Sequence, residues 1–307
     1  MFRISRFSYK TLQLQKYCTN TKLTSENMSN TTIRQVLAAL EKFAPKSLSE
    51  SWDNTGLLVE PYTPRNIKKI LLTNDLTEDV ALEADNQGCE MIISYHPPIF
   101  APMKSVKQSA WKERIVSFLL EKRIFLYSPH TSWDAVQGGV NDWLASAFPV
   151  GKSEPITPGV DPKTGCGRFL HLEERISVSN AVARVKELTG LQYVRLALAR
   201  SKAMDEEILQ TIALCAGSGA SVLKNVSADL FLTGEMLHHD VLDATQKGIS
   251  VILTNHSDSE RGFLKDFSIY LENELYHKVE VISASNRKSL VRQDQRRNGT
   301  PLSLHEL

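Results

Sequence analysis

Short apolar segments alternate with amphipathic helices along most of this chain, and this alternation constrains the fold more than any other feature. Apolar, β-branched runs are typical of buried strands, whereas apolar residues spaced three and four apart are typical of helices. The pattern predicts two similar α/β halves with mixed, largely parallel sheets flanked by helices. Strands are expected at 68–75, 89–96, 124–130, 193–200, 209–216, 228–235, 249–256 and 278–285, and helices at 32–43, 77–87, 111–123, 138–148, 236–248 and 259–275.

The length of 307 residues is sufficient for two domains, or for one large α/β domain with a tail. The segment at 151–167 is rich in proline and glycine and is interpreted as a linker between the halves. The predicted organisation, in chain order, is a basic leader at 1–31, a first α/β half at 32–150, the linker, a second α/β half at 168–285, and a disordered basic tail at 286–307.

The composition excludes several classes of protein. A formal net charge of +1 argues against direct nucleic-acid binding, which needs a concentrated basic face. No run approaches 18 consecutive apolar residues, so no membrane span is expected. Cysteine is found at positions 18, 89, 166 and 215, without paired spacing. This pattern favours a reducing compartment such as the cytoplasm and argues against a thiolate zinc site.

The leader is compatible with more than one subcellular location. Its first 25 residues contain five basic residues and no acidic one, which resembles a mitochondrial presequence. A disordered tail, or an extension upstream of an alternative start at Met28, explains the same composition. A cytoplasmic location is expected, with mitochondrial and nuclear locations as alternatives.

Three expected strands end in histidine, at His96, His130 and His256. Ligands of open α/β sheets bind at the carboxyl ends of the strands, so each imidazole lies where a site is expected. Asp134 follows His130 by four residues, and Glu260 follows His256 by four. This spacing lets both side chains of a pair face one point.

Imidazole and carboxylate are common ligands of divalent first-row metal ions, which predicts a site for one or two ions of zinc, manganese or iron. Each histidine taken singly is more simply explained as a buried hydrogen-bonding group; the repeated pattern favours the metal. Glu235, His238 and His239 are interpreted as a polar helix face near the site. The segment "CAGSGAS" at 215–221 can cradle an anion, but a tight turn explains it better because a third glycine is absent.

Six segments follow one another in the order "ESWDNTGLL", "IISYHPPIF", "SPHTSWDAVQGGVND", "CAGSGAS", "DLFLTGEMLHHDVLDA" and "NHSDSERGFL". Together they resemble the Nif-three-like family, also known as the GTP cyclohydrolase I type-two family. The resemblance covers about 32–285 and implies a dinuclear metal site between two α/β halves in a ring-shaped homo-hexamer. It also implies that this chain lacks a middle module inserted in longer relatives. The implied metal ligands are His96, Asp134, His256 and Glu260, with His130 beside them.

One position departs from the pattern of bacterial relatives, which have two adjacent histidines before the proline. This chain has Tyr95 followed by His96. A phenol is a weak ligand at neutral pH because its ordinary pKa is about 10. The departure predicts that one of the two metal positions binds weakly, or is filled only when the substrate supplies a ligand.

Two hypotheses on function follow. The first is a metal-dependent hydrolase of a nucleotide-like or phosphorylated small molecule, with His130 and Glu260 moving protons. The second is a non-catalytic protein that binds partners in transcription regulation and whose metal is structural or sensory. The sequence alone does not decide whether the protein is an enzyme.

Overall fold

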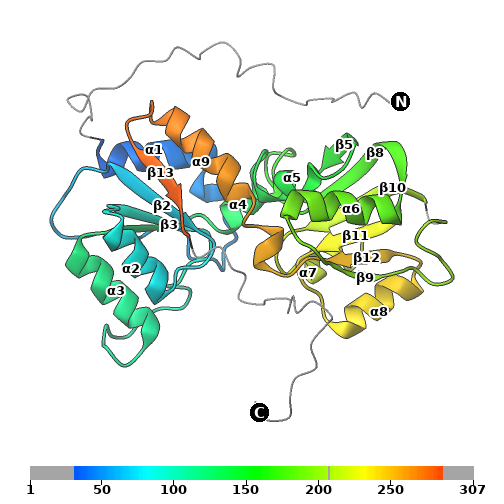
Figure 1. Ribbon diagram of the computed structural model, residues 1–307, viewed down its shortest axis with the longest axis horizontal. Helices are drawn as coiled ribbons and strands as arrows, with labels where there is room; N and C mark the ends of the chain where they lie inside the picture. Colours follow the sequence, from blue (N-terminus) through cyan, green and yellow to red (C-terminus); the bar gives the residue numbers. More distant parts are fainter. Residues whose placement is uncertain (1–30, 207, 286–307) are drawn as a thin grey trace, which may run out of the picture.

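The computed structural model describes residues 31–206 and 208–285 of the chain. The expected leader at 1–31 and tail at 286–307 lie outside these residues, except for Thr31. Within them the fold is mixed α/β, with two main sheets side by side and helices on their faces (Figure 1). The predicted fold class is confirmed.

The first sheet has the strand order β1-β4-β3-β2-β13. Strands β4, β3, β2 and β13 are parallel, and β1 pairs antiparallel with β4. Its strands are β1 (Gly56–Val59), β2 (Lys69–Thr73), β3 (Met91–Ser94), β4 (Phe125–Ser128) and β13 (Glu280–Ser283). The helices of this half are α1 (Ile33–Phe43), η2 (Lys46–Leu48), α2 (Glu78–Asn86), α3 (Trp111–Lys122), α4 (Thr131–Ala135) and α9 (Phe263–Glu274).

The second sheet has the strand order β5-β8-β10-β11-β12-β9. Strands β10, β11 and β12 are parallel, whereas β5, β8 and β9 add antiparallel edges. Its strands are β5 (Val150–Glu154), β8 (Arg168–Ser177), β9 (Arg195–Ala197), β10 (Ile208–Cys215), β11 (Leu230–Thr233) and β12 (Ser250–Leu253), and β6 (Thr157–Pro158) pairs with β7 (Gly165–Cys166) beside it. The helices are α5 (Val140–Ala145), α6 (Val178–Thr189), α7 (Ala220–Leu223), α8 (His238–Gln246) and η3 (Ser257–Ser259).

Alternation along each buried strand assigns side chains to two faces of the sheet. On β2, Ile70 and Leu72 pack toward α1 and α9, while Leu71 packs toward α2 and α3. On β11, Leu230 and Leu232 pack toward α5 and α6, while Phe231 packs toward α7 and α8. The α1/α9 face and the α5/α6 face belong to one continuous apolar cluster. The two halves therefore share a core along one side of the molecule.

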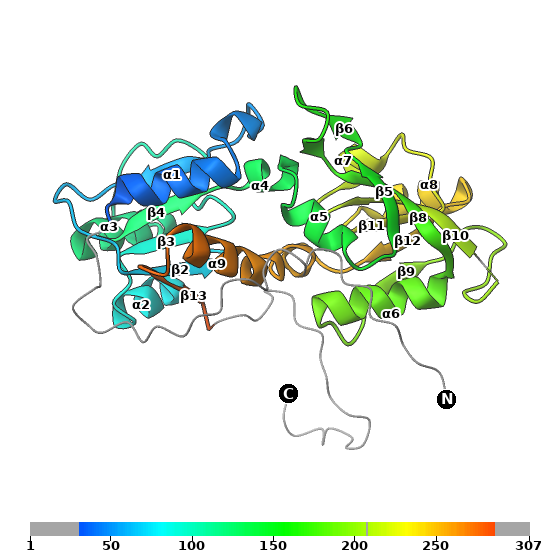
Figure 2. The same ribbon diagram turned by 90° about the horizontal axis from the view of Figure 1, so that it is seen from above.

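The strand pairing differs from the ranges expected for the halves and the linker. The segment expected as a linker contains β5, which pairs with β8, and the small β6–β7 hairpin. After β12 the chain crosses back, and α9 and β13 complete the first half (Figure 2). The physical reason is that β2 needs a second parallel neighbour, and β13 supplies its hydrogen bonds. The division into functional domains itself stays a prediction.

Candidate metal centre

The three histidines lie at the carboxyl ends of strands in both sheets and meet at one place. His96 follows β3, His130 follows β4, and His256 follows β12. The ring centroids of His96 and His256 are 5.2 Å apart, and those of His96 and His130 are 5.4 Å apart. The two sheets thus bring together side chains that are 160 positions apart in the chain (256 − 96).

His96, His256 and Glu260 form a group that can hold a metal ion. One ligand atom from each lies within 4.8 Å of the others. The Glu260 carboxylate is only 3% exposed, with Oε1 3.2 Å from His256 Nε2 and Oε2 3.5 Å from His96 Nε2. Among the described residues, the buried Nε2 of His96 has no hydrogen-bond partner. A buried nitrogen that makes no hydrogen bond and faces a carboxylate and a second imidazole fits a divalent cation.

A carboxylate stands behind each of the three imidazoles. The Nδ1 atoms of His96, His130 and His256 each lie 2.8 Å from a carboxylate oxygen. The partners are Asp75 for His96, Asp53 for His130 and Glu235 for His256. With Nδ1 held in this way, His96 and His256 each direct Nε2 toward Glu260, and a carboxylate on Nδ1 is the arrangement found behind metal-binding histidines.

Sequence reasoning did not identify Asp53 or Asp75, and it placed Glu235 only on a nearby polar face. Asp75 had a usable signal, because it stands two residues beyond the end of the buried strand β2. Its Oδ2 also accepts a hydrogen bond from Ser257 Oγ, across the two halves. Asp53 gave no such signal, since its partner His130 lies 77 residues away.

The electrostatics of the group favour a bound positive charge. Burial opposes protonation of His96, but Asp75 and Glu260 outweigh it and raise the pKa of this imidazole to about 10. A hydrogen bond to Glu260 raises the pKa of His256 to about 9. Burial works against ionisation of Glu260, yet the two imidazoles lower the pKa of its carboxyl to about 2. Without a metal ion, protons supply the positive charge that these carboxylates require.

Asp134 and Tyr95 lie next to this group but are paired with each other. The Tyr95 hydroxyl donates a hydrogen bond to Asp134 Oδ1. Burial raises the pKa of Asp134 to about 6, against the effect of this hydrogen bond. Asp134 lies outside the three-residue group, so its role as a metal ligand stays a prediction.

His130 lies beside the group in an unusual backbone conformation. It has a backbone φ of 37°, a value that residues other than glycine adopt at a cost of order 1–3 kcal/mol. Asn255, directly before His256, also has a positive φ of 71°. Such conformations concentrate at functional sites. The assignment of a catalytic role to His130 stays a prediction.

The glycine-rich loop after β10 packs against Glu260 and His256 of the candidate group. A Cβ at Gly217 would lie 2.5 Å from Glu260 Oε1, so only glycine leaves room for this carboxylate. The Gly217 N–H donates to Ser259 Oγ, and the Gly219 N–H donates to Thr233 Oγ1. Because both N–H groups are already bonded within the protein, these bonds favour the tight turn over the anion cradle.

The other polar residues of this region lie outside the candidate group. His238 and His239 are exposed at the start of α8, and neither belongs to the three-residue group. Glu235, from the same sequence segment, contacts the site through His256. Glu235 precedes α8, so the segment between β11 and this helix contributes the carboxylate, while the two histidines lie outside the candidate group.

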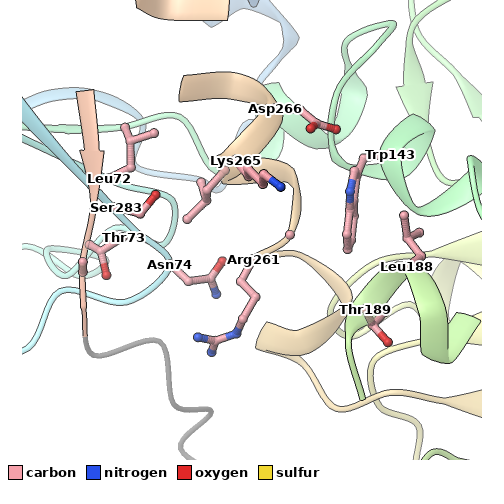
Figure 3. Close-up of a pocket in the computed structure, with 13 residues that line it drawn as sticks. Leu72, Thr73, Asn74, Trp143, Leu188, Thr189, Arg261, Lys265, Asp266 and Ser283 are labelled. Carbon is pink, nitrogen blue, oxygen red and sulfur yellow. The ribbon is translucent and has the colours of Figure 1, made fainter. Parts of the chain in front are cut away.

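A cavity of about 420 Å³ opens between the halves, and Asn74 and Arg261 are among the residues that line it. Figure 3 shows Leu72 and Asn74 on one wall, Trp143 and Thr189 on the other, and Lys265 between them. Asn74 connects the cavity to the candidate group, because its Nδ2 donates a 3.0 Å hydrogen bond to Glu260 Oε2. Asn74 thereby fixes the orientation of the carboxylate.

None of the helices in the described residues has both the length and the apolar composition needed to cross a bilayer.

Comparisons with known proteins agree with the motifs. The family model described as Duf34/NIF3 (NGG1p interacting factor 3) matches residues 31–289. NIF3-like protein 1 of Drosophila melanogaster is 49% identical over 270 residues, covering 85% of this chain and 91% of that protein. NGG1-interacting factor 3 of Saccharomyces cerevisiae is 36% identical, covering 84% of this chain and 96% of its own length.

The fold agrees as well. The crystal structure of the Bacillus cereus protein related to NIF3 superposes with a TM-score of 0.76 at 18% identity, covering 86% of this chain and all of that one. Together, the matched family model and the relatives show that this chain belongs to the Duf34/NIF3 family.

Proposed function

We propose that this protein is a metal-dependent hydrolase of a nucleotide-like or otherwise phosphorylated small molecule. The observation that carries the proposal is the group of His96, His256 and Glu260, with a buried His96 Nε2 that has no hydrogen-bond partner among the described residues. Three protein ligands are typical of catalytic metal sites, which keep a position open for water or substrate.

The accessibility of the group supports a catalytic site over a closed structural one. The His96 and His256 side chains are 21% and 36% exposed, whereas Glu260 is buried beneath them. A divalent ion held here would polarise a substrate oxygen and make water a better nucleophile near neutral pH. The identity of the metal is proposed to be zinc, manganese or iron, since the available donors are nitrogen and oxygen.

Each residue has a proposed role. His96, His256 and Glu260 hold the ion, and Asp134 is proposed as a further ligand once Tyr95 releases it. His130 is proposed to move a proton, because Asp53 holds its Nδ1 and leaves its Nε2 available. Glu260 is proposed to act both as ligand and in proton transfer. Assembly into a homo-hexamer remains part of the proposal.

The alternative function is partner binding with a structural or sensory metal. The observation that favours it is the name of the yeast relative, NGG1-interacting factor 3. If this alternative holds, chelation should unfold the protein or open the contact between the halves. If the site is catalytic, chelation should abolish hydrolysis while the circular dichroism spectrum stays unchanged.

The direct test is elemental analysis of the natively purified protein, followed by hydrolysis assays on nucleotides and phosphoesters. We expect about one ion per chain and metal-dependent hydrolysis of at least one substrate. His256→Ala should lower both values, and His238→Ala, on the exposed start of α8, is the matched control. A protein without bound metal, or with metal and no hydrolysis across the panel, would contradict the proposal.

A further inference from the structure

We infer that Trp52 and Phe100 form a binding position for a flat ring of the substrate, next to the metal group. The inference rests on the proposed function and extends it, because it favours a ring-bearing, nucleotide-like substrate over a ring-free phosphoester. It starts from an unusual exposure of large aromatic side chains. Trp52 is 59% exposed and Phe100 is 49% exposed, although most large apolar side chains of the described residues are buried or partly buried.

The two rings lie together at the edge of the candidate metal centre. Their centroids are 6.0 Å apart. The ring of Trp52 also meets His130 edge-on, with centroids 6.0 Å apart and an interplanar angle of 79°. His130 in turn contacts His96. A ring bound on Trp52 is therefore one imidazole away from the metal ligands, within reach for a substituent of the same molecule.

The backbone that carries Trp52 is fixed to the site by hydrogen bonds. Its neighbour Asp53 bonds His130 Nδ1 through Oδ1 and accepts from the backbone N–H of Thr131 through Oδ2. On the other side, the Glu50 N–H donates to Thr131 Oγ1. These bonds hold an exposed tryptophan in place without covering it. A position prepared in this way loses little conformational entropy when a ligand binds.

The segment carrying Phe100 is tied to the same loop. Asn54 Nδ2 donates to the carbonyl of Ile99, directly before Phe100. Pro97 and Pro98 follow His96 and restrict the backbone between the metal ligand and the aromatic residue. Hydrogen bonds and backbone restriction thus fix the segments that carry both rings relative to the candidate metal centre.

The ring geometry defines how a ligand binds. The planes of Trp52 and Phe100 are tilted by 55° at a centroid distance of 6.0 Å, so a third ring does not fit between them. A flat ring instead stacks on the open face of Trp52, with Phe100 at its edge. Stacking of this kind tolerates different bases because every base has a π-face. The position therefore selects for a ring and not for one particular base.

The test compares ligands that differ only in the ring. Zinc-loaded protein is titrated calorimetrically with adenosine, guanosine and uridine 5′-monophosphates and with ribose 5-phosphate. We expect at least one nucleotide to bind about tenfold more tightly than ribose 5-phosphate, the range that stacking on one aromatic side chain provides. Trp52→Leu should reduce this preference to about twofold or less, and Phe100→Leu should reduce it in part. Neither change should alter metal content or the affinity for ribose 5-phosphate.

Trp111→Leu is the matched control. Trp111 is 45% exposed, begins α3, and has the Lys112 ammonium group over its ring. It should leave the preference unchanged. The inference is overturned if the wild-type protein shows no ring-dependent binding, or if Trp52→Leu keeps the preference. It is also overturned if Trp52→Leu changes only the oligomeric state, because the rings then cover a second copy of the chain.

The outcomes separate this inference from the proposed function. Hydrolysis of phosphoesters without a preference for rings would refute the ring position alone. Ring-dependent binding in a protein that hydrolyses none of the compounds would refute the hydrolase alone.

Discussion

Two neighbouring residues at the end of β3, His96 and Tyr95, face two sides of the same centre with opposite results. On the His96 side, two imidazoles and the Glu260 carboxylate present ligand atoms around a shared point. On the Tyr95 side, the phenol is hydrogen-bonded to Asp134, and burial raises its pKa well above the ordinary value. A neutral phenol is a poor metal ligand, and this one also donates a hydrogen bond to the Asp134 carboxylate beside it. We propose that the His96 side is a prepared position for a cation and that the Tyr95 side is a closed position, because a hydrogen bond occupies its carboxylate.

The largest effect is expected from removing the charge at the prepared position. Glu260→Gln keeps the size of the side chain but removes the negative charge that lies between His96 and His256. We expect loss of nearly all bound metal, measured by elemental analysis after native purification. His238→Ala should keep its metal. A Glu260→Gln protein with full metal content would show that the prepared position was assigned wrongly.

The next effect is expected from the carboxylate behind His96. Asp75→Asn removes the charged partner of Nδ1, and loss of such a partner weakens metal affinity about 10- to 100-fold. The measurement is competition with a chelator of known affinity. Asp79→Asn, at an exposed position in the first turn of α2, serves as the control and should match the wild type. Equal metal affinities for the two variants would show that Asp75 does not support metal binding by His96.

A smaller effect is expected from pH, as a change in apparent metal affinity for each pH unit. Because the pKa values of His96 and His256 are raised to about 10 and about 9, both imidazoles carry protons at pH 7 in the metal-free protein. A metal ion must displace these protons, so its apparent affinity should keep rising from pH 7 to about 9. Ordinary imidazoles, with pKa near 6.5, would give an affinity that levels off close to pH 7. Titrations at pH 6, 7, 8 and 9 distinguish the two curves, and a plateau above pH 7 would contradict the raised values.

The smallest change is expected at the closed position. Tyr95→His replaces the phenol with a donor and frees Asp134 from its hydrogen bond. We expect the metal content to rise from about one ion per chain toward two. Tyr95→Phe frees Asp134 without adding a donor and controls for the loss of the hydroxyl. If the histidine variant binds no more metal than the phenylalanine variant, the difference between the two sides does not lie in residue 95.

The sequence by itself determined the α/β class and the placement of histidines at strand ends. Apolar periodicity shows which faces are buried, and polar residues that follow a buried strand must emerge at its end. His96 and His256 were therefore identifiable as candidates, and the structure brings them together. The His256–Glu260 pairing was also expected, although it forms across the short η3 turn and not on the longer helix α9.

Only the tertiary structure decided which groups stand behind those histidines and how the strands divide between the sheets. Asp53 and His130 are 77 residues apart, and the return of β13 to β2 joins residues about 210 positions apart (280 − 69 = 211). The apolar periodicity of the sequence does not identify such pairs, because it indicates which faces are buried and not which strands pair. Likewise, the sequence shows only that Tyr95 stands where bacterial relatives have a histidine. Its hydrogen bond to Asp134 depends on the packing of β3 beside β4. The chemistry of the centre follows from these long-range contacts, which form only when the two sheets are assembled.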